Sequence, residues 1–230
     1  STGLIVMKVE LVDSMGTDLT VVNAARVSFN KESSYKLNEM GESLEDKDAR
    51  LLKYLADHDH FTPFTHVTVT MREKVPLFVA RQRFKHTVGF SYNEVSRRYV
   101  DEDPEFYKPT DWRGKAVDKK QGSSDVIVDI NPATDDGRRA MMDDYDIAIN
   151  RCIWVYKHLL RKGVCPEQAR MVLPQSMYTE YYVTGSLYAW ARAYNLRSKE
   201  DEQQEIQELA KGWDDILIMR FPESWIALTN

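Results

Sequence analysis

The chain has 230 residues, enough for a substantial hydrophobic core, and its 36 acidic against 31 basic residues give a formal net charge of −5. This acidic balance argues against a broad nucleic-acid-binding surface. No apolar run approaches the roughly 20 residues that span a bilayer. The two cysteines provide no disulfide framework, and there is no signal-peptide pattern, so we expect a soluble cytoplasmic protein.

The first half of the chain alternates between strand and helix patterns. Branched apolar residues predict a strand over 4–12, and a helix is predicted over 18–27. Residues 30–45 are polar and irregular and predict a mobile loop. A second helix is predicted over 46–57, with its leucines on one stripe. Strict alternation over 66–75 then predicts a half-buried strand, with Val67, Val69 and Met71 on one face.

A short span from Pro76 to Tyr99 concentrates positive charge in this acidic chain. Proline suits the first position of a helix, so a helix is predicted from Pro76 to about His86. Residues 92–100 predict an extended strand with Glu94, Ser96 and Arg98 on one side. Cations beside hydroxyl and carboxyl groups suit an anion that carries a planar polar ring. We therefore interpret this span as a nucleotide site.

The second half begins with a polar excursion over 101–137, which is too long for a simple connector and is expected to be an ordered excursion or lid. A long helix is predicted over 138–162, with Cys152 on its buried stripe. The further predictions are a short helix over 166–172, a strand over 175–183, a helix over 185–196 and an amphipathic helix that opens at 198 and ends at Pro222.

Two other chemistries were weighed. Three histidines and two aspartates between Asp57 and His66 could suggest a metal site, but no cysteine joins them and no HExxH spacing is present, so we predict no metal. Cys165 beside a turn could be a nucleophile. No motif typical of a thiolate nucleophile surrounds it, and a structural role is favoured. The GxGxxG and Walker patterns are also absent.

The basic span resembles the signature of the flavin-dependent thymidylate synthases. It reads Lys85-His86-Thr87, a spacer of eight residues, and then Asn93-Glu94-Val95-Ser96-Arg97-Arg98-Tyr99. The commonest family form has arginine at both ends of the triplet and a spacer of seven. Four other family elements occur in the same order along the chain: ARVSF at 25–29, His-x-Thr-Pro-Phe at 60–64, ARxxLP at 169–174 and NLR at 195–197.

The resemblance implies a fold and an activity. The fold is an α+β domain over 1–230, a largely antiparallel twisted sheet flanked by helices, and the family assembles as a homotetramer whose sites are shared between subunits. The activity is reductive methylation of dUMP to dTMP. Methylenetetrahydrofolate supplies the carbon, and NADPH reduces a bound FAD. Neither nucleic acid nor a membrane is an expected partner.

The resemblance also implies roles for individual residues. Arg197 is the catalytic candidate near the uracil, and Ser96 is a second candidate for which a binding role is favoured because no His-Asp pattern would activate it. The expected dUMP-binding residues are Gln82, Lys85, Glu94, Val95, Ser96, Arg97, Arg98, Arg170 and Arg197. The expected FAD-binding residues are Ser28, His60, Thr62, Lys85, His86, Thr87, Val88, Asn93 and Glu94.

Two rival functions stay open at this point. A flavin-dependent oxidoreductase that acts on another substrate would bind FAD and oxidise NADPH without responding to dUMP. A non-enzymatic nucleotide-binding module would bind dUMP yet purify colourless. A metal-dependent phosphohydrolase is a more distant alternative and would lose its activity with a chelator.

Overall fold

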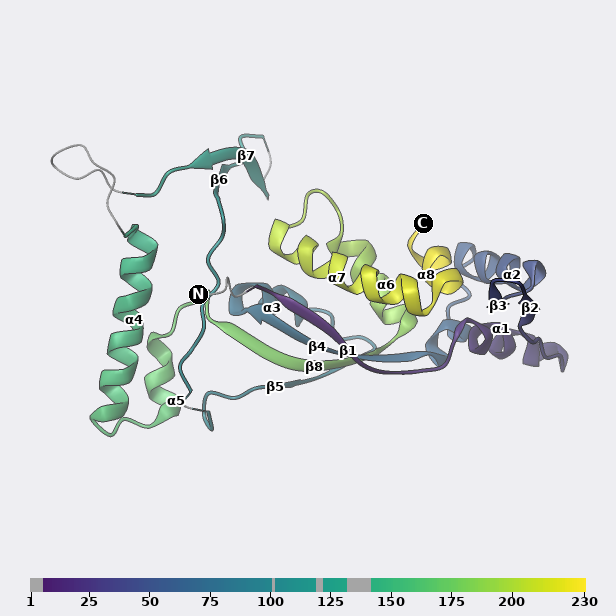
Figure 1. Ribbon diagram of the computed structural model, residues 1–230, viewed down its shortest axis with the longest axis horizontal. Helices are drawn as coiled ribbons and strands as arrows, with labels where there is room; N and C mark the ends of the chain where they lie inside the picture. The colour runs from purple at the N-terminus through teal and green to yellow at the C-terminus, as the bar shows by residue number, and fades with distance from the viewer. Residues whose placement is uncertain (1–5, 101, 119–121, 132–141) are drawn as a thin grey trace. The chain divides into compact units, whose positions relative to one another are not determined.

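The computed structural model describes residues 6–100, 102–118, 122–131 and 142–230. Figure 1 labels the strands and α-helices. The strands are β1 (Lys8–Met15), β2 (Lys36–Asn38), β3 (Gly41–Ser43), β4 (Thr68–Pro76), β5 (Phe90–Glu94), β6 (Trp112–Lys115), β7 (Ser123–Val128) and β8 (Tyr178–Ser186). The helices are α1 (Asp18–Arg26), α2 (Asp46–Asp57), α3 (Leu77–Arg83), α4 (Asp144–Arg161), α5 (Pro166–Ala169), α6 (Leu187–Arg197), α7 (Gln204–Arg220) and α8 (Pro222–Thr229), with the short elements η1 (Val27–Phe29), η2 (Thr62–His66) and η3 (Arg170–Val172). The η elements are 3₁₀ helices. In the described part of the chain, no helix is both long and apolar enough to cross a membrane.

The structure divides into two compact units. The first unit contains Lys74–Arg81 and the described part of Glu94–Glu180. The second unit contains Lys8–Glu73, Gln82–Asn93 and Tyr181–Asn230. Strands and helices are mixed in a way that confirms the predicted α+β class, and the hairpins β2–β3 and β6–β7 are antiparallel.

Most of a four-stranded sheet of order β1-β4-β8-β5 belongs to the second unit. Val67, Val69 and Met71 are fully buried, which confirms the face predicted from their alternation. Helix α6 packs on this face, because the Trp190 Nε1–H donates to the Val69 carbonyl at 3.2 Å. Helix α7 approaches β1 so closely that a Cβ on Gly212 would lie 2.8 Å from a Val9 methyl group. Figure 1 shows α6, α7 and α8 together along these strands.

Several local predictions differ from the structure, among them the amphipathic helix predicted to open at residue 198, which begins at Gln204. Residues 36–43 form a hairpin instead of a loop, because the Asn38 side chain accepts from the Met40 N–H and Gly41 adopts a φ of 112°. The predicted strand over 92–100 ends at Glu94. A further helix, α8, begins at Pro222, since proline ends one helix and is well suited to start the next.

The first unit has its own small core. Tyr156 of α4 is buried with Ala169, Leu173 and Met177, and Phe106 packs against them. Of the stripe predicted for the long helix, only Tyr156 is fully buried, while Cys152 is half-buried. Helix α4 begins at Asp144, and the start predicted for it at residue 138 lies outside the described residues.

A fully buried ion pair lies in the core of the second unit. Arg83 at the end of α3 donates from Nε to the Glu73 carboxylate on β4 at 3.0 Å, and both side chains are completely excluded from solvent. The same carboxylate accepts from the Tyr181 hydroxyl at 2.6 Å and from Trp213 Nε1 at 2.7 Å. Burial is the largest influence and disfavours the Arg83 charge, but the attraction of Glu73, Tyr181 and Tyr92 together with the hydrogen bond to Glu73 outweighs it and raises the pKa of Arg83.

Glu73→Gln should therefore destabilise the fold strongly. The substitution leaves a buried guanidinium without its counter-ion, which typically costs about 3–5 kcal/mol. Urea unfolding at neutral pH measures the loss. Lys53→Ala is the matched control, because it breaks an exposed pair with Asp57 that contributes at most about 0.5 kcal/mol. Equal losses in the two variants would contradict the importance of the buried pair.

Candidate functional site

The signature segment leaves the sheet at Glu94 and turns. The Ser96 hydroxyl accepts from the Arg98 N–H at 3.2 Å, and the Tyr99 N–H donates to the Ser96 carbonyl at 3.1 Å. The predicted alternation of Glu94, Ser96 and Arg98 along a strand is thus wrong, because the serine side chain competes for the backbone and stabilises a turn. In this turn the side chains of Ser96 and Arg98 do not follow the alternation that a strand would give them.

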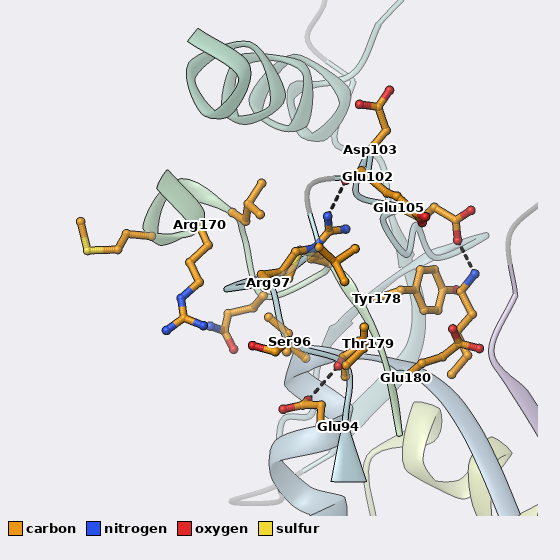
Figure 2. Close-up of a pocket in the computed structure, with 18 residues that line it drawn as sticks. Glu94, Ser96, Arg97, Glu102, Asp103, Glu105, Arg170, Tyr178, Thr179 and Glu180 are labelled. Carbon is orange, nitrogen blue, oxygen red and sulfur yellow. Dashed lines mark hydrogen bonds and ion pairs between the residues drawn. The ribbon is translucent and has the colours of Figure 1, made fainter. Parts of the chain in front are cut away.

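This turn lines a cavity of about 830 Å³ in the first unit. Glu94, Val95, Ser96 and Arg97 come from the turn, and Arg170 comes from η3, more than seventy residues along the chain. Figure 2 shows these side chains around the cavity, with Glu94 bonded to Thr179 at its lower end. The cavity therefore joins two of the predicted substrate motifs.

Arg98 does not line the cavity, but it is tied to Arg170 through Glu167. The Arg98 Nε–H donates to the Glu167 carboxylate at 3.2 Å, and the Arg170 Nε–H donates to the Glu167 carbonyl at 3.1 Å. Arg98 and Arg170 are exposed. Two guanidinium groups held on one residue, beside a serine hydroxyl, form a suitable site for a phosphate.

The opposite wall of the cavity is acidic. Glu102, Asp103 and Glu105 come from the start of the polar excursion, and Figure 2 shows them away from Arg170. The excursion is ordered here, because the Tyr178 N–H donates to the Glu105 carbonyl at 2.8 Å and Phe106 forms a bridge with Met177. This part of the excursion is a wall of the cavity.

A second group of predicted residues meets in the second unit, around Arg197. The Arg197 Nε–H donates to His86 Nε2 at 3.0 Å, and Nη2 donates to the Gln82 carbonyl at 3.2 Å. Nη1 donates to the Glu202 carboxylate at 2.9 Å. The structure thus brings Gln82, His86 and Arg197 together.

His86 is neutral in this cluster. Burial lowers the pKa of the ring to about 4, and the nearby charges of Arg83, Arg197 and Arg192 act in the same direction. Because Nε2 accepts from Arg197, the ring proton is on Nδ1. A neutral acceptor and a permanent cation therefore stand side by side.

The segment that follows His86 presents exposed polar groups. Lys85, Thr87 and Val88 are exposed, and the chain turns back at Gly89 with a φ of 81°. A Cβ at Gly89 would lie 2.9 Å from the Ala189 methyl group, so only glycine fits. The ammonium and hydroxyl donors of this segment suit the pyrophosphate of a flavin dinucleotide.

The other predicted cofactor residues are also exposed on the second unit. Ser28 lies on η1, Thr62 begins η2, and Asn93 lies on β5. His60 is exposed beside the Tyr54 ring. Their hydroxyl, amide and imidazole groups are compatible with a polar cofactor. Among the described residues, no group of three or more histidine, cysteine, aspartate or glutamate side chains could hold a metal ion.

Sequence reasoning missed several residues of these two clusters. Glu167 and Glu202 were treated as parts of helix starts, although each contacts a predicted arginine. Glu73 was detectable, since it continues the alternation of the buried face and a buried carboxylate needs a partner. No local pattern indicates that Glu202 contacts Arg197.

Comparisons with known proteins agree with these motifs. The family model described as "Thymidylate synthase complementing protein" (Thy1) matches residues 10–223. The chain is 39% identical to the flavin-dependent thymidylate synthase of Thermosipho africanus over 92% of this chain and 86% of that protein. It is 37% identical to the enzyme of the same name from Thermus thermophilus, over 95% and 74%.

Among solved structures, the UMP/dUMP methylase PolB from Streptomyces cacaoi, bound with 5-Br dUMP, has a similar fold. The TM-score is 0.80 at 28% identity, and the match covers 98% of this chain and 96% of that one. The matches span almost the whole chain and include each of the five motifs. The chain therefore belongs to the flavin-dependent thymidylate synthase family.

Proposed function

We propose that this protein converts dUMP to dTMP by reductive methylation. Methylenetetrahydrofolate donates its methylene carbon, NADPH supplies the hydride that reduces this carbon to a methyl group, and tetrahydrofolate and NADP⁺ are released. The observation that carries the proposal is the first-unit cavity, which joins Ser96 and Arg97 of the signature to the distant Arg170. Family membership makes this arrangement an expected dUMP site.

In this proposal the first unit holds the phosphate of dUMP. Arg98 and Arg170 bind its oxygens by charge-assisted hydrogen bonds, and Ser96 donates its hydroxyl proton to a third. Val95 and Arg97 belong to the same wall, and Glu94 accepts from the ribose hydroxyl. No histidine lines the described part of the cavity, which supports a binding role for Ser96 over a nucleophilic one.

The second unit provides Arg197 and Gln82 for the uracil. A guanidinium beside the ring stabilises negative charge that develops on the uracil oxygens, an effect often worth several kcal/mol. Gln82 is expected to orient the base, and its Oε1 is buried and has no hydrogen-bond partner among the described residues. Lys85 is assigned to both the substrate and the cofactor.

FAD fits the donor set of the second unit. Lys85, His86, Thr87 and Val88 would hold its pyrophosphate side, together with Ser28, His60, Thr62 and Asn93. Glu94, the remaining residue expected to bind FAD, belongs to the first unit and is an acceptor, so it is not assigned to the pyrophosphate. The chemistry that FAD supplies when bound is hydride transfer from NADPH. The chain's own residues bind and orient the cofactor and the substrate, and they exclude water from the site. Residues 1–230 then act as one domain, and shared sites in a homotetramer would allow residues of different subunits to complete each other.

The proposal also covers location and substrate range. A cytoplasmic protein would have access to dUMP, folate and NADPH. PolB is named a methylase of both UMP and dUMP, so UMP is a necessary comparison substrate. The ammonium and hydroxyl groups that we assign to FAD do not discriminate between the two nucleotides.

The proposed function predicts a yellow protein whose NADPH oxidation depends on dUMP. A visible spectrum of the purified protein reports bound flavin, and dTMP is measured by chromatography with methylenetetrahydrofolate present. NADPH oxidation that ignores dUMP would instead indicate an oxidoreductase with another substrate. A colourless protein that stays inactive with added FAD, yet binds dUMP, would indicate a nucleotide-binding module.

Ser96→Ala should weaken dUMP binding and leave activity. Loss of a hydrogen bond to a charged phosphate costs about 1.5–3 kcal/mol, so we expect the KM for dUMP to rise about 10-fold or more while kcat changes little. Ser91→Ala, on the exposed part of β5, is the control. Complete loss of turnover with unchanged dUMP affinity would establish Ser96 as the nucleophile.

The neutral His86 predicts a pH-dependent stability. The folded ring has a pKa of about 4 and the unfolded ring about 6.5, so the unfolded chain binds the extra proton between these values. The free energy of unfolding should therefore fall as the pH drops from about 6.5 to about 4, and stay level above 6.5. We expect a loss of roughly 1–2 kcal/mol, discounted because the ring is only half-buried.

Urea unfolding of the wild type and of His86→Gln across this range isolates the contribution of the ring. Burial raises the pKa of Asp18, which acts in the opposite direction as the pH falls, but it does so equally in both proteins. The difference between the two curves of unfolding free energy against pH should show the loss of roughly 1–2 kcal/mol that we expect from His86. Parallel curves would refute the neutral assignment of His86.

A further inference from the structure

The Arg197 guanidinium is held by three acceptors of different kinds. Nε donates to the His86 ring, Nη2 donates to the Gln82 carbonyl, and Nη1 donates to the Glu202 carboxylate. Only 14% of the Arg197 side chain and 20% of the Glu202 side chain are exposed. Glu202 is the one charged acceptor of the three.

Three fixed nitrogens define the plane of a guanidinium. The group has five N–H donors, of which these contacts use one on each nitrogen. The two donors that remain are one on Nη1 and one on Nη2, and both lie in the same plane. Holding the plane therefore fixes the direction in which Arg197 can reach a substrate oxygen.

Glu202 is itself fixed by its backbone. It lies in the segment 198–203 between α6 and α7, where the Glu202 N–H donates to the Lys199 carbonyl at 3.1 Å. The Gln207 side chain, on the first turns of α7, donates to the Glu202 carbonyl at 2.7 Å. The carboxylate is thus attached to a well-bonded turn, and its contact with Arg197 transmits the position of that turn.

We propose that Glu202 is a positioning residue for Arg197 and orients the guanidinium toward the uracil. This inference rests on the proposed function, in which Arg197 contacts the substrate. All three bonds are charge-assisted because the guanidinium is ionised, and Glu202 holds the Nη1 edge, which neither of the other acceptors contacts. The carbonyl of Gln82 and the ring of His86 restrict the rotation of the guanidinium through their contacts with Nη2 and Nε.

A competing role is electrostatic. A carboxylate at 2.9 Å also reduces the positive potential of Arg197, and in that role its charge would matter more than its position. Two substitutions separate the roles. Glu202→Gln keeps an acceptor oxygen at the same length and removes the charge, whereas Glu202→Ala removes both.

The test compares kcat and KM for dUMP in the FAD-loaded variants. Positioning predicts that Glu202→Ala lowers kcat about 10-fold or more, since a small misplacement of a reacting group is costly. It predicts that Glu202→Gln stays within about threefold of the wild type, because the retained acceptor holds the guanidinium. Glu200→Ala, an exposed carboxylate of the same turn, is the matched control and should be unchanged. Equal damage from the Gln and Ala variants, or an unchanged kcat in Glu202→Ala, would overturn the proposal.

A double-mutant cycle with Arg197→Ala tests whether Glu202 acts through that arginine. If it does, Glu202→Ala has no further effect on kcat once Arg197 is absent. Additive losses would overturn the proposal. Crystal structures of the two Glu202 variants give a readout without turnover: the Arg197–His86 contact should be lost in the Ala variant and kept in the Gln variant. Failure of the proposed function would appear separately, as a wild-type protein that forms no dTMP.

Discussion

The buried pair of Arg83 and Glu73 is the interaction on which the second unit depends. A guanidinium with no access to water is stable only because a carboxylate faces it, and Trp213 and Tyr181 satisfy the remaining oxygen lone pairs of Glu73. The pair fixes the end of α3 against β4. Gln82 and His86 flank Arg83 in sequence, so the buried pair also sets where the acceptors of Arg197 lie. The geometry of the cluster is thus a consequence of the core.

The same pair shapes the electrostatics of the cluster. Burial is the largest cause of the low pKa of His86, and the positive charge of Arg83 adds to it. A histidine that cannot gain a proton at neutral pH remains an acceptor for the Arg197 Nε–H. Arg197 therefore faces a neutral ring instead of a second cation, and among the described residues Glu202 is the anion that pairs with it. A fixed cation of this kind suits a site where negative charge develops.

Elements with a clear period were predictable, while contacts between distant residues were not. The alternation of Val67, Val69 and Met71 gave the buried face of β4, and the leucine stripe gave α2 with its observed ends. The family motifs indicated Arg197 and the signature before any contact was known. The predicted strand continues beyond Glu94, where the observed strand ends, because the period of the side chains does not reveal that the Ser96 hydroxyl bonds to the backbone two residues on. Contacts such as Glu202 with Arg197 depend on the packing of the turn.

The cavity of the first unit presents an apparent conflict, because its lining has five carboxylates and three cations. Three of these acids are bonded to a lysine or to a hydroxyl group. Lys74 pairs with Glu105, Lys157 lies 3.0 Å from Asp103, and the Thr179 hydroxyl donates to Glu94 at 2.8 Å. The two lysines weaken the negative potential of Glu105 and Asp103, whereas Arg98 donates to the Glu167 carboxylate and Arg170 donates to the neutral carbonyl of the same residue. In the proposed function, the phosphate would bind on the side of Arg170, and the acidic wall would face the donor groups of the sugar. The polar excursion contributes that wall through Glu102, Asp103 and Glu105, so its acidity would help to orient the nucleotide that we propose for this cavity.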